Sequence, residues 1–361
     1  MKNLTARILC ASALISGIVS VAGAQDAAST PAVLLRSIPI LKPDSSNINV
    51  VTEGEWTLLD KASKKWSLCA SLPTMKDPYW KAVDYGLVSQ AERIGIKLTI
   101  LDAGGYDNLS KQISDLEDCA STGADAILVA AISGEGVKSK VDQLVSDGTP
   151  VIETVNRVES PNVTGRSTLD FKRLGIAAAD YLKDQAGGKP LRVAWFPGPE
   201  GAGWAVRSDE GFKEALKGTN VEIVATKWGD TGRDVQLGLI EDTLQAESSI
   251  DWIVGVAPAA EAAVGALKDA DRTEVKIAST YQTDAVARAV AAKDIAYSGN
   301  DNVVWMAAIA LDLAVRQLQG EDIKGVEIWP KPQAFTSDKP VDLENSSGFA
   351  PQDFQPKFQV Q

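Results

Sequence analysis

From Trp66 onward, short runs of apolar residues alternate regularly with longer segments of mixed polarity. The runs, such as Trp66–Leu72 and Ala126–Ala130, have the length and composition of strands that are buried on both faces. In the segments between them, apolar residues recur every three or four positions, which predicts amphipathic helices. Regular alternation of strand and helix predicts an α/β protein with parallel, doubly wound sheets.

The predicted elements follow one another closely along the chain. Strands are predicted at Trp66–Leu72, Lys97–Leu101, Ala126–Ala130, Pro150–Thr154, Leu191–Phe196, Glu222–Thr226, Trp252–Val256, Val275–Thr280 and Ile295–Ser298. Helices are predicted at Pro78–Ile94, Asn108–Thr122, Gly134–Asp147, Phe171–Asp184, Ala202–Leu216, Arg233–Ala246, Ala259–Ala270, Asp284–Ala292 and Val303–Leu318. The stretch before Trp66 and the proline-rich stretch Trp329–Gln361 fall outside this pattern. We expect one short strand in each, and the strand in the first stretch is expected at Trp56–Leu59.

A chain of 361 residues is too long for one ordinary hydrophobic core. Because the strand–helix pattern runs through two consecutive halves, we expect two lobes that are joined by a hinge and close on a ligand. The expected division is 25–65 for an N-terminal extension packed on the first lobe, 66–156 plus 282–302 for the N-terminal lobe, 157–281 plus 303–340 for the C-terminal lobe, and 341–361 for a tail.

Residues 1–24 have the pattern of a secretory signal peptide. The basic residues Lys2 and Arg7 precede the apolar segment Ile8–Val21. After it, Ala22–Ala24 offers small residues for cleavage. The alternative is an uncleaved membrane anchor, but the segment is short for a membrane span. We therefore expect a periplasmic protein whose mature chain does not insert into the membrane.

The composition removes several classes of function. The chain has no histidine, which excludes Ser-His-Asp or Cys-His catalysis and histidine-ligated metal sites. The turn at Gly104-Gly105 lacks the Gly-x-Gly-x-x-Gly spacing of a dinucleotide-binding loop. The net charge of −12 argues against nucleic acid as a partner. We therefore expect a binding protein for a small molecule, not an enzyme, with no metal or cofactor.

Two cysteines, Cys69 and Cys119, remain once the signal segment is removed. An even number of cysteines in an exported protein favours a disulfide. In a sheet with strand order 2-1-3, the second crossover helix passes over the first strand, so Cys119 on that helix would lie near Cys69. We expect this bridge, with two buried free thiols as the alternative.

Five aromatic residues fall at strand ends or on the first turns of helices, where the ligands of open α/β sheets bind. They are Tyr79, Trp80, Tyr106, Phe171 and Tyr281. A ring of aromatic faces attracts a quaternary ammonium group, because the π quadrupole favours diffuse positive charge by about 0.5–2 kcal/mol per face. The alternative for any one of them is packing within or between the lobes.

Three charged residues are further candidates for the ligand site. Asp77 could face a cation, although its position before Pro78 also suits a helix N-cap. Asp301 opens the last long helix, where a cap is again the alternative. Arg157 offers a forked donor for a carboxylate or vicinal hydroxyls, with a surface salt bridge as the alternative.

Several motifs resemble those of the type I periplasmic binding proteins and, more closely, the TorT-type sensors of trimethylamine N-oxide. The resemblance extends from about Trp66 to Gly320. The motifs are Trp66–Trp80 (WSLCASLPTMKDPYW), Leu101–Tyr106, Cys119, Gly123–Leu128, Pro197–Pro199, Ala202-Gly203, Ala260–Ala263, Tyr281, Asp301, Val304-Trp305 and Val315–Gly320. Among these, the Lys-Asp-x-Tyr-Trp motif and the paired cysteines are specific to the sensor branch.

The resemblance implies a type I periplasmic binding protein fold and an aromatic box around a trimethylated head group. Tyr79, Trp80, Tyr106 and Tyr281 match the family box, whereas Phe171 stands where the family has tryptophan. The resemblance also implies a sensor that signals to the periplasmic domain of a TorS-like histidine kinase. The alternative is the substrate-binding protein of an ABC importer for a sugar or small amine.

Overall fold

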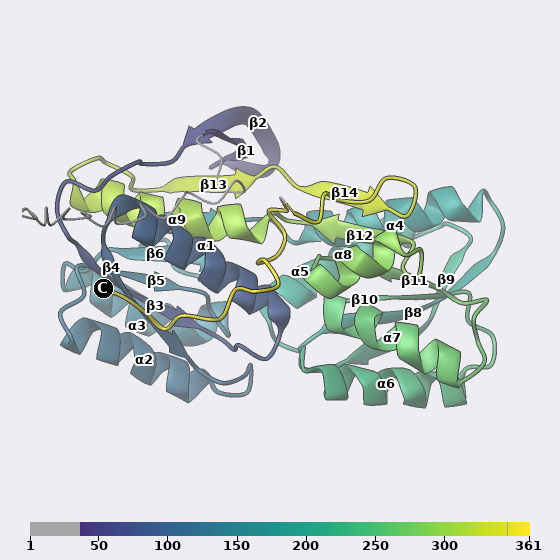
Figure 1. The fold of residues 1–361 in the computed structure, drawn as a ribbon. Helices are drawn as coiled ribbons and strands as arrows, with labels where there is room; N and C mark the ends of the chain where they lie inside the picture. Colours follow the sequence, from purple (N-terminus) through teal and green to yellow (C-terminus); the bar gives the residue numbers. More distant parts are fainter. Residues whose placement is uncertain (1–36, 345) are drawn as a thin grey trace, which may run out of the picture.

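The computed structural model describes residues 37–344 and 346–361, so the predicted signal peptide lies outside the described residues. Two α/β lobes lie side by side, each built around its own sheet (Figure 1). All the helices and strands predicted between residues 66 and 318 are present, with ends within two residues of the expected positions. No helix among the described residues is long and apolar enough to cross a membrane.

The sheet of the first lobe has nine strands in the order β15-β4-β3-β5-β6-β7-β13-β1-β2. Helices α1 and α9 pack together on one face, and α2 and α3 pack on the other (Figure 1). The strands are β1 (Ser37–Asp44), β2 (Asn47–Thr57), β3 (Ser67–Leu72), β4 (Lys97–Asp102), β5 (Ala126–Val129), β6 (Val151–Val155), β7 (Gly165–Thr168), β13 (Val326–Pro330) and β15 (Gln359–Val360), and the helices are α1 (Pro78–Ile94), α2 (Leu109–Ser121), α3 (Gly134–Ser146) and α9 (Val303–Leu318).

The sheet of the second lobe has six strands in the order β14-β12-β11-β10-β8-β9. Helices α4 and α5 form one layer, and α6, α7 and α8 form the other. The strands are β8 (Leu191–Gly198), β9 (Val221–Trp228), β10 (Trp252–Gly255), β11 (Lys276–Ser279), β12 (Tyr297–Asn300) and β14 (Gln333–Thr336), and the helices are α4 (Lys172–Ala186), α5 (Gly203–Leu216), α6 (Arg233–Ala246), α7 (Ala257–Asp269) and α8 (Asp284–Ala291).

The division into lobes differs from the expected one. β7 belongs to the first sheet, and the chain enters the second lobe between Thr168 and Lys172. Residues 282–302, expected in the first lobe, carry α8 and β12, and β12 pairs with β11 of the second sheet. α9 and β13, expected in the second lobe, pack in the first, so the chain crosses again after Asn300 and after Pro330. The strand–helix pattern looks the same on both sides of each crossing and therefore does not mark it.

The N-terminal extension forms a hairpin that enlarges the first sheet. β1 and β2 pair with each other, and β1 also pairs with β13, with Ile40 opposite Pro330. Ile38 and Ile40 of β1 are fully buried, whereas β2 at the sheet edge is mostly exposed. The extension thus packs on the first lobe as expected, but its strands are longer than the single strand predicted at Trp56–Leu59.

The C-terminal tail runs from the second lobe back to the far edge of the first (yellow in Figure 1). It crosses the hinge at Ser347, whose carbonyl oxygen accepts from the backbone N–H of Val304 at the start of α9. The backbone N–H of Lys357 then donates to the buried carboxylate of Asp84 on α1 (2.8 Å). Finally, β15 pairs with β4. The tail therefore ties both lobes together across the hinge.

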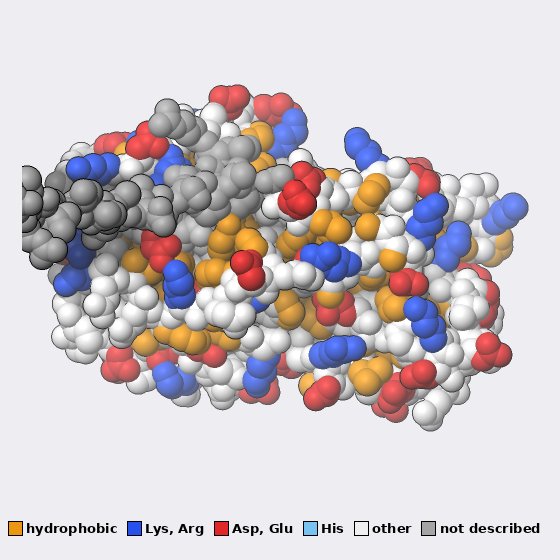
Figure 2. Space-filling view, viewed as in Figure 1, with side chains coloured by type: hydrophobic (Ala, Val, Ile, Leu, Met, Phe, Trp, Pro, Cys, Tyr) orange, Lys and Arg blue, Asp and Glu red, His pale blue; other side chains and the backbone are white. Residues whose placement is uncertain are grey.

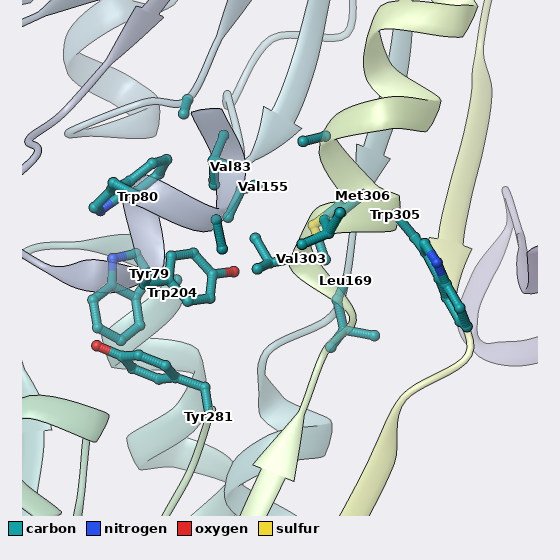
Figure 3. Close-up of a cluster of buried hydrophobic side chains, with 14 of the residues drawn as sticks. Tyr79, Trp80, Val83, Val155, Leu169, Trp204, Tyr281, Val303, Trp305 and Met306 are labelled. Atoms are coloured by element: carbon teal, nitrogen blue, oxygen red, sulfur yellow. The ribbon is translucent and has the colours of Figure 1, made fainter. Parts of the chain in front are cut away.

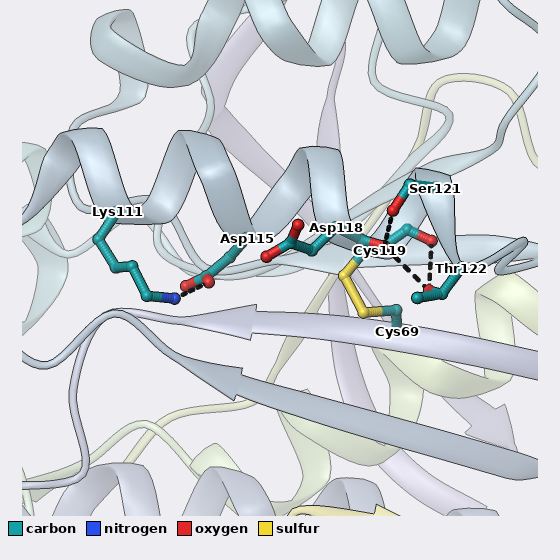
Figure 4. The surroundings of a disulfide bond; sticks show 7 residues. All are labelled: Cys69, Lys111, Asp115, Asp118, Cys119, Ser121 and Thr122. Atoms are coloured by element: carbon teal, nitrogen blue, oxygen red, sulfur yellow. Dashed lines mark hydrogen bonds and ion pairs between the residues drawn. A yellow bond between two sulfur atoms is a disulfide. The ribbon is translucent and has the colours of Figure 1, made fainter.

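The expected disulfide is present between Cys69 on β3 and Cys119 on α2 (Figure 4). The two Cα atoms are 5.5 Å apart, and both residues are buried in the apolar layer between the sheet and α2. In the chain-entropy model, closing a loop of this length stabilises the fold by about 4 kcal/mol.

Acidic and basic side chains are interspersed over the described part of the face shown in Figure 2. The described part of this face therefore shows no extended patch of one charge sign.

Candidate functional site

The N-terminus of α1 carries two aromatic residues to the carboxyl edge of the first sheet. The carboxylate of Asp77 accepts from the backbone N–H of Tyr79 (2.9 Å), and Pro78 takes the first helical position. This cap starts the helix directly after β3 and its short connecting loop. Tyr79 and Trp80 therefore lie on the first turn, where a parallel sheet binds its ligands.

A small cavity lies between the lobes at this point, with a volume of about 20 Å³. We call it the interlobe cavity. Its lining combines six aromatic side chains, one carboxylate and one amide: Tyr79, Trp80, Tyr106, Phe171, Trp204, Tyr281, Asp77 and Asn156. Both lobes contribute, since Trp80 comes from α1 of the first lobe and Trp204 from α5 of the second. Figure 3 shows Tyr79, Trp80, Trp204 and Tyr281 gathered together.

The aromatic rings meet edge to face. The centroids of Tyr79 and Tyr281 are 5.0 Å apart with planes at 71°, and those of Tyr79 and Trp80 are 5.6 Å apart at 78°. Trp204 and Tyr281 are 6.3 Å apart at 82°. Such pairs stabilise one another, and their differing orientations turn ring faces in several directions. A group enclosed among them would therefore meet aromatic faces on more than one side.

Two buried carboxylates lie behind the tyrosines. The Tyr281 hydroxyl donates to Asp77 (2.6 Å), and the Tyr79 hydroxyl donates to Asp301 (2.5 Å). Burial raises the pKa of Asp77 to about 7 and that of Asp301 to about 6. No basic side chain in the described chain pairs with either carboxylate. When they are ionised, their negative charge favours a cation in the cavity.

The hydroxyl of Tyr106 is differently arranged. It accepts from the side-chain amide of Asn156 (3.1 Å) and from the indole N–H of Trp204 (3.1 Å). Both bonds use its lone pairs, and its own proton has no acceptor among the described residues. The Asn156 amide also donates to the carbonyl of Ala131 (2.9 Å), which fixes its orientation. Tyr106 is therefore a lining residue with a hydroxyl proton left for a ligand acceptor.

The structure brings most of the predicted ligand residues to the cavity, but two lie elsewhere. Asp301 sits behind Tyr79 and reaches the cavity only through that hydroxyl. Arg157 does not line the cavity, because its guanidinium makes a two-point ion pair with Glu327 (2.9 and 3.2 Å). Arg157 therefore forms a salt bridge, which was the alternative expected for it. The geometry does not support its predicted place in the ligand site.

The sequence prediction did not include Trp204 or Asn156. Trp204 follows the same rule that identified Trp80, since it lies on the first turn of the helix after a strand. A further signal is Gly198, whose backbone has φ +106° and lies against the indole; a Cβ there would approach the ring of Trp204 to 2.8 Å. Glycine is needed at this position both for its conformation and for the close approach of the ring.

Residues 69–322 match the family described as the periplasmic binding protein domain. The periplasmic protein TorT of Escherichia coli K12 is 36% identical over 265 residues, which cover 73% of this chain and 76% of TorT. The hairpin β1–β2 and the C-terminal tail lie outside the region that matches the family.

Two solved structures share the fold. An ABC transporter solute-binding protein from Bradyrhizobium sp. BTAi1 with bound Bis-Tris is 36% identical, with a TM-score of 0.75, covering 89% of this chain and 98% of that one. The complex of the TorS sensor domain with TorT in the presence of trimethylamine N-oxide contains a chain that is 28% identical, with a TM-score of 0.74, covering 81% of this chain and 100% of that one.

Proposed function

This chain belongs to the periplasmic binding protein family, and we propose that its interlobe cavity binds trimethylamine N-oxide or a related small methylated amine. The protein is periplasmic and acts by binding, as do its relatives, and not by catalysis. The observation that carries the proposal is the lining of the cavity, where aromatic rings, the buried carboxylate of Asp77 and one available hydroxyl proton meet.

Each part of an amine oxide has a counterpart in this lining. Its methyl groups carry diffuse positive charge, which ring faces such as those of Tyr79 and Trp80 attract by about 0.5–2 kcal/mol each. The carboxylate of Asp77 adds longer-range attraction when ionised. The oxygen is a strong acceptor, and the unused proton of Tyr106 can meet it. Tyr106 thus supplies the donor for the oxygen, whereas the guanidinium of Arg157 is paired with Glu327.

The related proteins support an amine ligand. TorT has been crystallised with the TorS sensor domain in the presence of trimethylamine N-oxide. The Bradyrhizobium protein binds Bis-Tris, which is a tertiary amine. A site built for substituted amines would be common to all three proteins.

Signalling follows from the position of the cavity between the lobes. A ligand that contacts Trp80 of one lobe and Trp204 of the other favours the closed arrangement by its difference in affinity for the closed and open forms. We propose that the periplasmic domain of a TorS-like sensor histidine kinase recognises that change of shape.

A second candidate is the substrate-binding protein of an ABC importer. It is favoured by the similarity to the Bradyrhizobium solute-binding protein. The two roles need the same cavity but different partners. Co-purification with a sensor kinase domain would indicate a sensor, whereas stimulation of a permease–ATPase complex in vesicles would indicate an importer.

Replacing Tyr106 by Phe tests the binding mode directly. The change keeps the ring but removes the hydroxyl, so the affinity for trimethylamine N-oxide should fall about tenfold or more, as expected for a hydrogen bond of about 1.5–3 kcal/mol to a charged acceptor. Tetramethylammonium has no oxygen, and the ratio of the two affinities, measured by calorimetry, isolates the hydrogen bond. Tyr85→Phe, on α1 but outside the cavity lining, is the matched control. An unchanged ratio in Tyr106→Phe would contradict the proposed mode.

A further inference from the structure

A second, larger hollow adjoins the interlobe cavity and shares two of its walls. This outer groove has a volume of about 360 Å³ and a mostly apolar lining. Its own lining includes Ile48 of the β1–β2 hairpin, Leu169 of the crossing between the lobes and Val206 of α5. Phe171 and Trp204 line both spaces. Their side chains are thus the partition between a cavity of about 20 Å³ and a groove many times larger.

The two halves of this partition are held very differently. The indole of Trp204 is fixed by its hydrogen bond to Tyr106 and by its packing against Gly198. Phe171 has no polar atom on its side chain and contacts Trp204 only ring to ring, with centroids 6.3 Å apart. Its side chain is buried, with an exposed fraction of 8%. Phe171 therefore closes the cavity by its bulk alone, so its size decides whether the two spaces connect.

Three of the four charged residues that line the outer groove are paired, and the fourth, Glu159, lies close enough to Arg157 to interact with its charge. Arg157 pairs with Glu327, and Arg207 makes a two-point contact with Asp170 (3.0 and 3.1 Å). The groove therefore offers mostly apolar surface, with ion-paired charges and the carboxylate of Glu159 at its edge. A group entering it from the cavity would have to be apolar or weakly polar.

We propose that Phe171 determines specificity by size, confining the ligand to a head group no larger than a trimethylated nitrogen with one small substituent. This inference rests on the proposed function of the cavity. If Phe171 is made smaller, the cavity opens into the outer groove, and a methylated ammonium compound with a longer arm, such as choline, fits with its arm in the groove. The aromatic rings that hold the head group remain in place.

The test compares the affinities for trimethylamine N-oxide and choline by calorimetry. The wild type should bind the N-oxide at least tenfold more tightly than choline. Phe171→Ala should reduce that ratio tenfold or more, chiefly because choline binds more tightly, and Phe171→Leu should lie between the two. Phe354→Ala is the matched control, since it makes the same truncation in the tail, away from both spaces.

The outcomes separate the partition from the ligand assignment. If both Phe171 variants lost affinity equally for the two ligands, so that the ratio stayed unchanged, the proposed size filter would be wrong. Phe171 would then be only one of the ring faces that contact the ligand. If the wild type bound neither compound but Phe171→Ala bound choline, the result would support the size filter. The same result would refute trimethylamine N-oxide as the ligand. Failure of every folded variant to bind either compound would refute both. Thermal denaturation of each variant establishes that it is folded.

Discussion

The six aromatic residues of the interlobe cavity share one local feature, since each follows the carboxyl end of a parallel strand. The sequence reveals this feature because the strand and the helix start are both local patterns, as at Asp77 and Trp80. Trp204 has the same feature and lies on a helix that was predicted to begin at Ala202, but it was not among the predicted ligand residues. Arg157, in contrast, was predicted to be a ligand residue but does not line the cavity. Its partner Glu327 lies 170 positions away, so no local pattern could reveal the ion pair.

Trp80 has a structural role as well as a place in the cavity. Its side chain is only 2% exposed and belongs to the largest apolar cluster of the molecule. Trp80→Ala should therefore lower the free energy of unfolding by about 3–5 kcal/mol, in addition to weakening ligand binding. Chemical denaturation of the ligand-free protein measures this effect. A residue of an open cleft would contribute almost nothing to stability, so an unchanged denaturation midpoint would contradict the structural role of Trp80.

At the scale of elements, the sequence predicts buried strands and amphipathic helices well and edge strands poorly. β3 and β5 are almost wholly buried and read as apolar runs. β2 and β14 are largely or partly exposed, and β15 has only two residues, so none of them produces such a run. These strands are fixed by pairing with segments far away in the chain, and that pairing leaves little trace in local composition.

The C-terminal tail should contribute measurably to stability. Removing Phe354–Gln361 eliminates β15, the bond from the Lys357 backbone to Asp84 and the ring contact of Phe354 with Tyr85 at 5.0 Å. We expect a loss of about 2–4 kcal/mol, seen as a melting temperature lower by several degrees, which is within the range for loss of buried contacts and a buried hydrogen bond.

Lys357→Ala is the control for this truncation. It keeps the backbone N–H and removes the exposed ion pair with Glu92, which is worth about 0–1 kcal/mol, together with the side-chain charge that acts on Asp84. If the truncated protein melted at the same temperature as Lys357→Ala, the tail would be an appendage and not a tie between the lobes.

At the scale of the whole molecule, the site lies where the described chain crosses between the lobes four times, after Thr168, after Asn300, after Pro330 and again in the C-terminal tail. The sequence indicates two lobes but does not show which elements belong to each, as the exchange of β12 and α9 relative to the expected division illustrates. Asp77 and Asp301 are buried between the lobes together with their tyrosine partners. Their ionisation is therefore linked to the stability and ligand affinity of the closed molecule.

This linkage predicts a dependence on pH. The pKa of Asp77 rises on folding from 3.8 to about 7, and that of Asp301 from 3.8 to about 6. Because the protonated forms are favoured in the folded state, the stabilisation they give is complete below the unfolded pKa and is lost as the pH rises through the folded values. In Asp77→Asn, the part of this pH dependence that belongs to Asp77 should disappear from denaturation curves measured between about pH 4 and pH 8.

Cation binding should show the opposite trend. Tetramethylammonium carries the same charge at every pH, so its affinity reports on the protein alone and should fall as the pH is lowered from about 8 to about 5 and the carboxylates are protonated. Calorimetry at several pH values measures it. Equal affinities across this range would show that the carboxylates do not act on the ligand.

The central claim is that the interlobe cavity recognises a small methylated amine. Calorimetric titration of the intact wild-type protein with trimethylamine N-oxide, and in parallel with ribose, tests it most directly. We predict saturable one-to-one binding of the N-oxide and no detectable heat from ribose. Saturable binding of ribose, with no response to the N-oxide or to tetramethylammonium, would contradict the account.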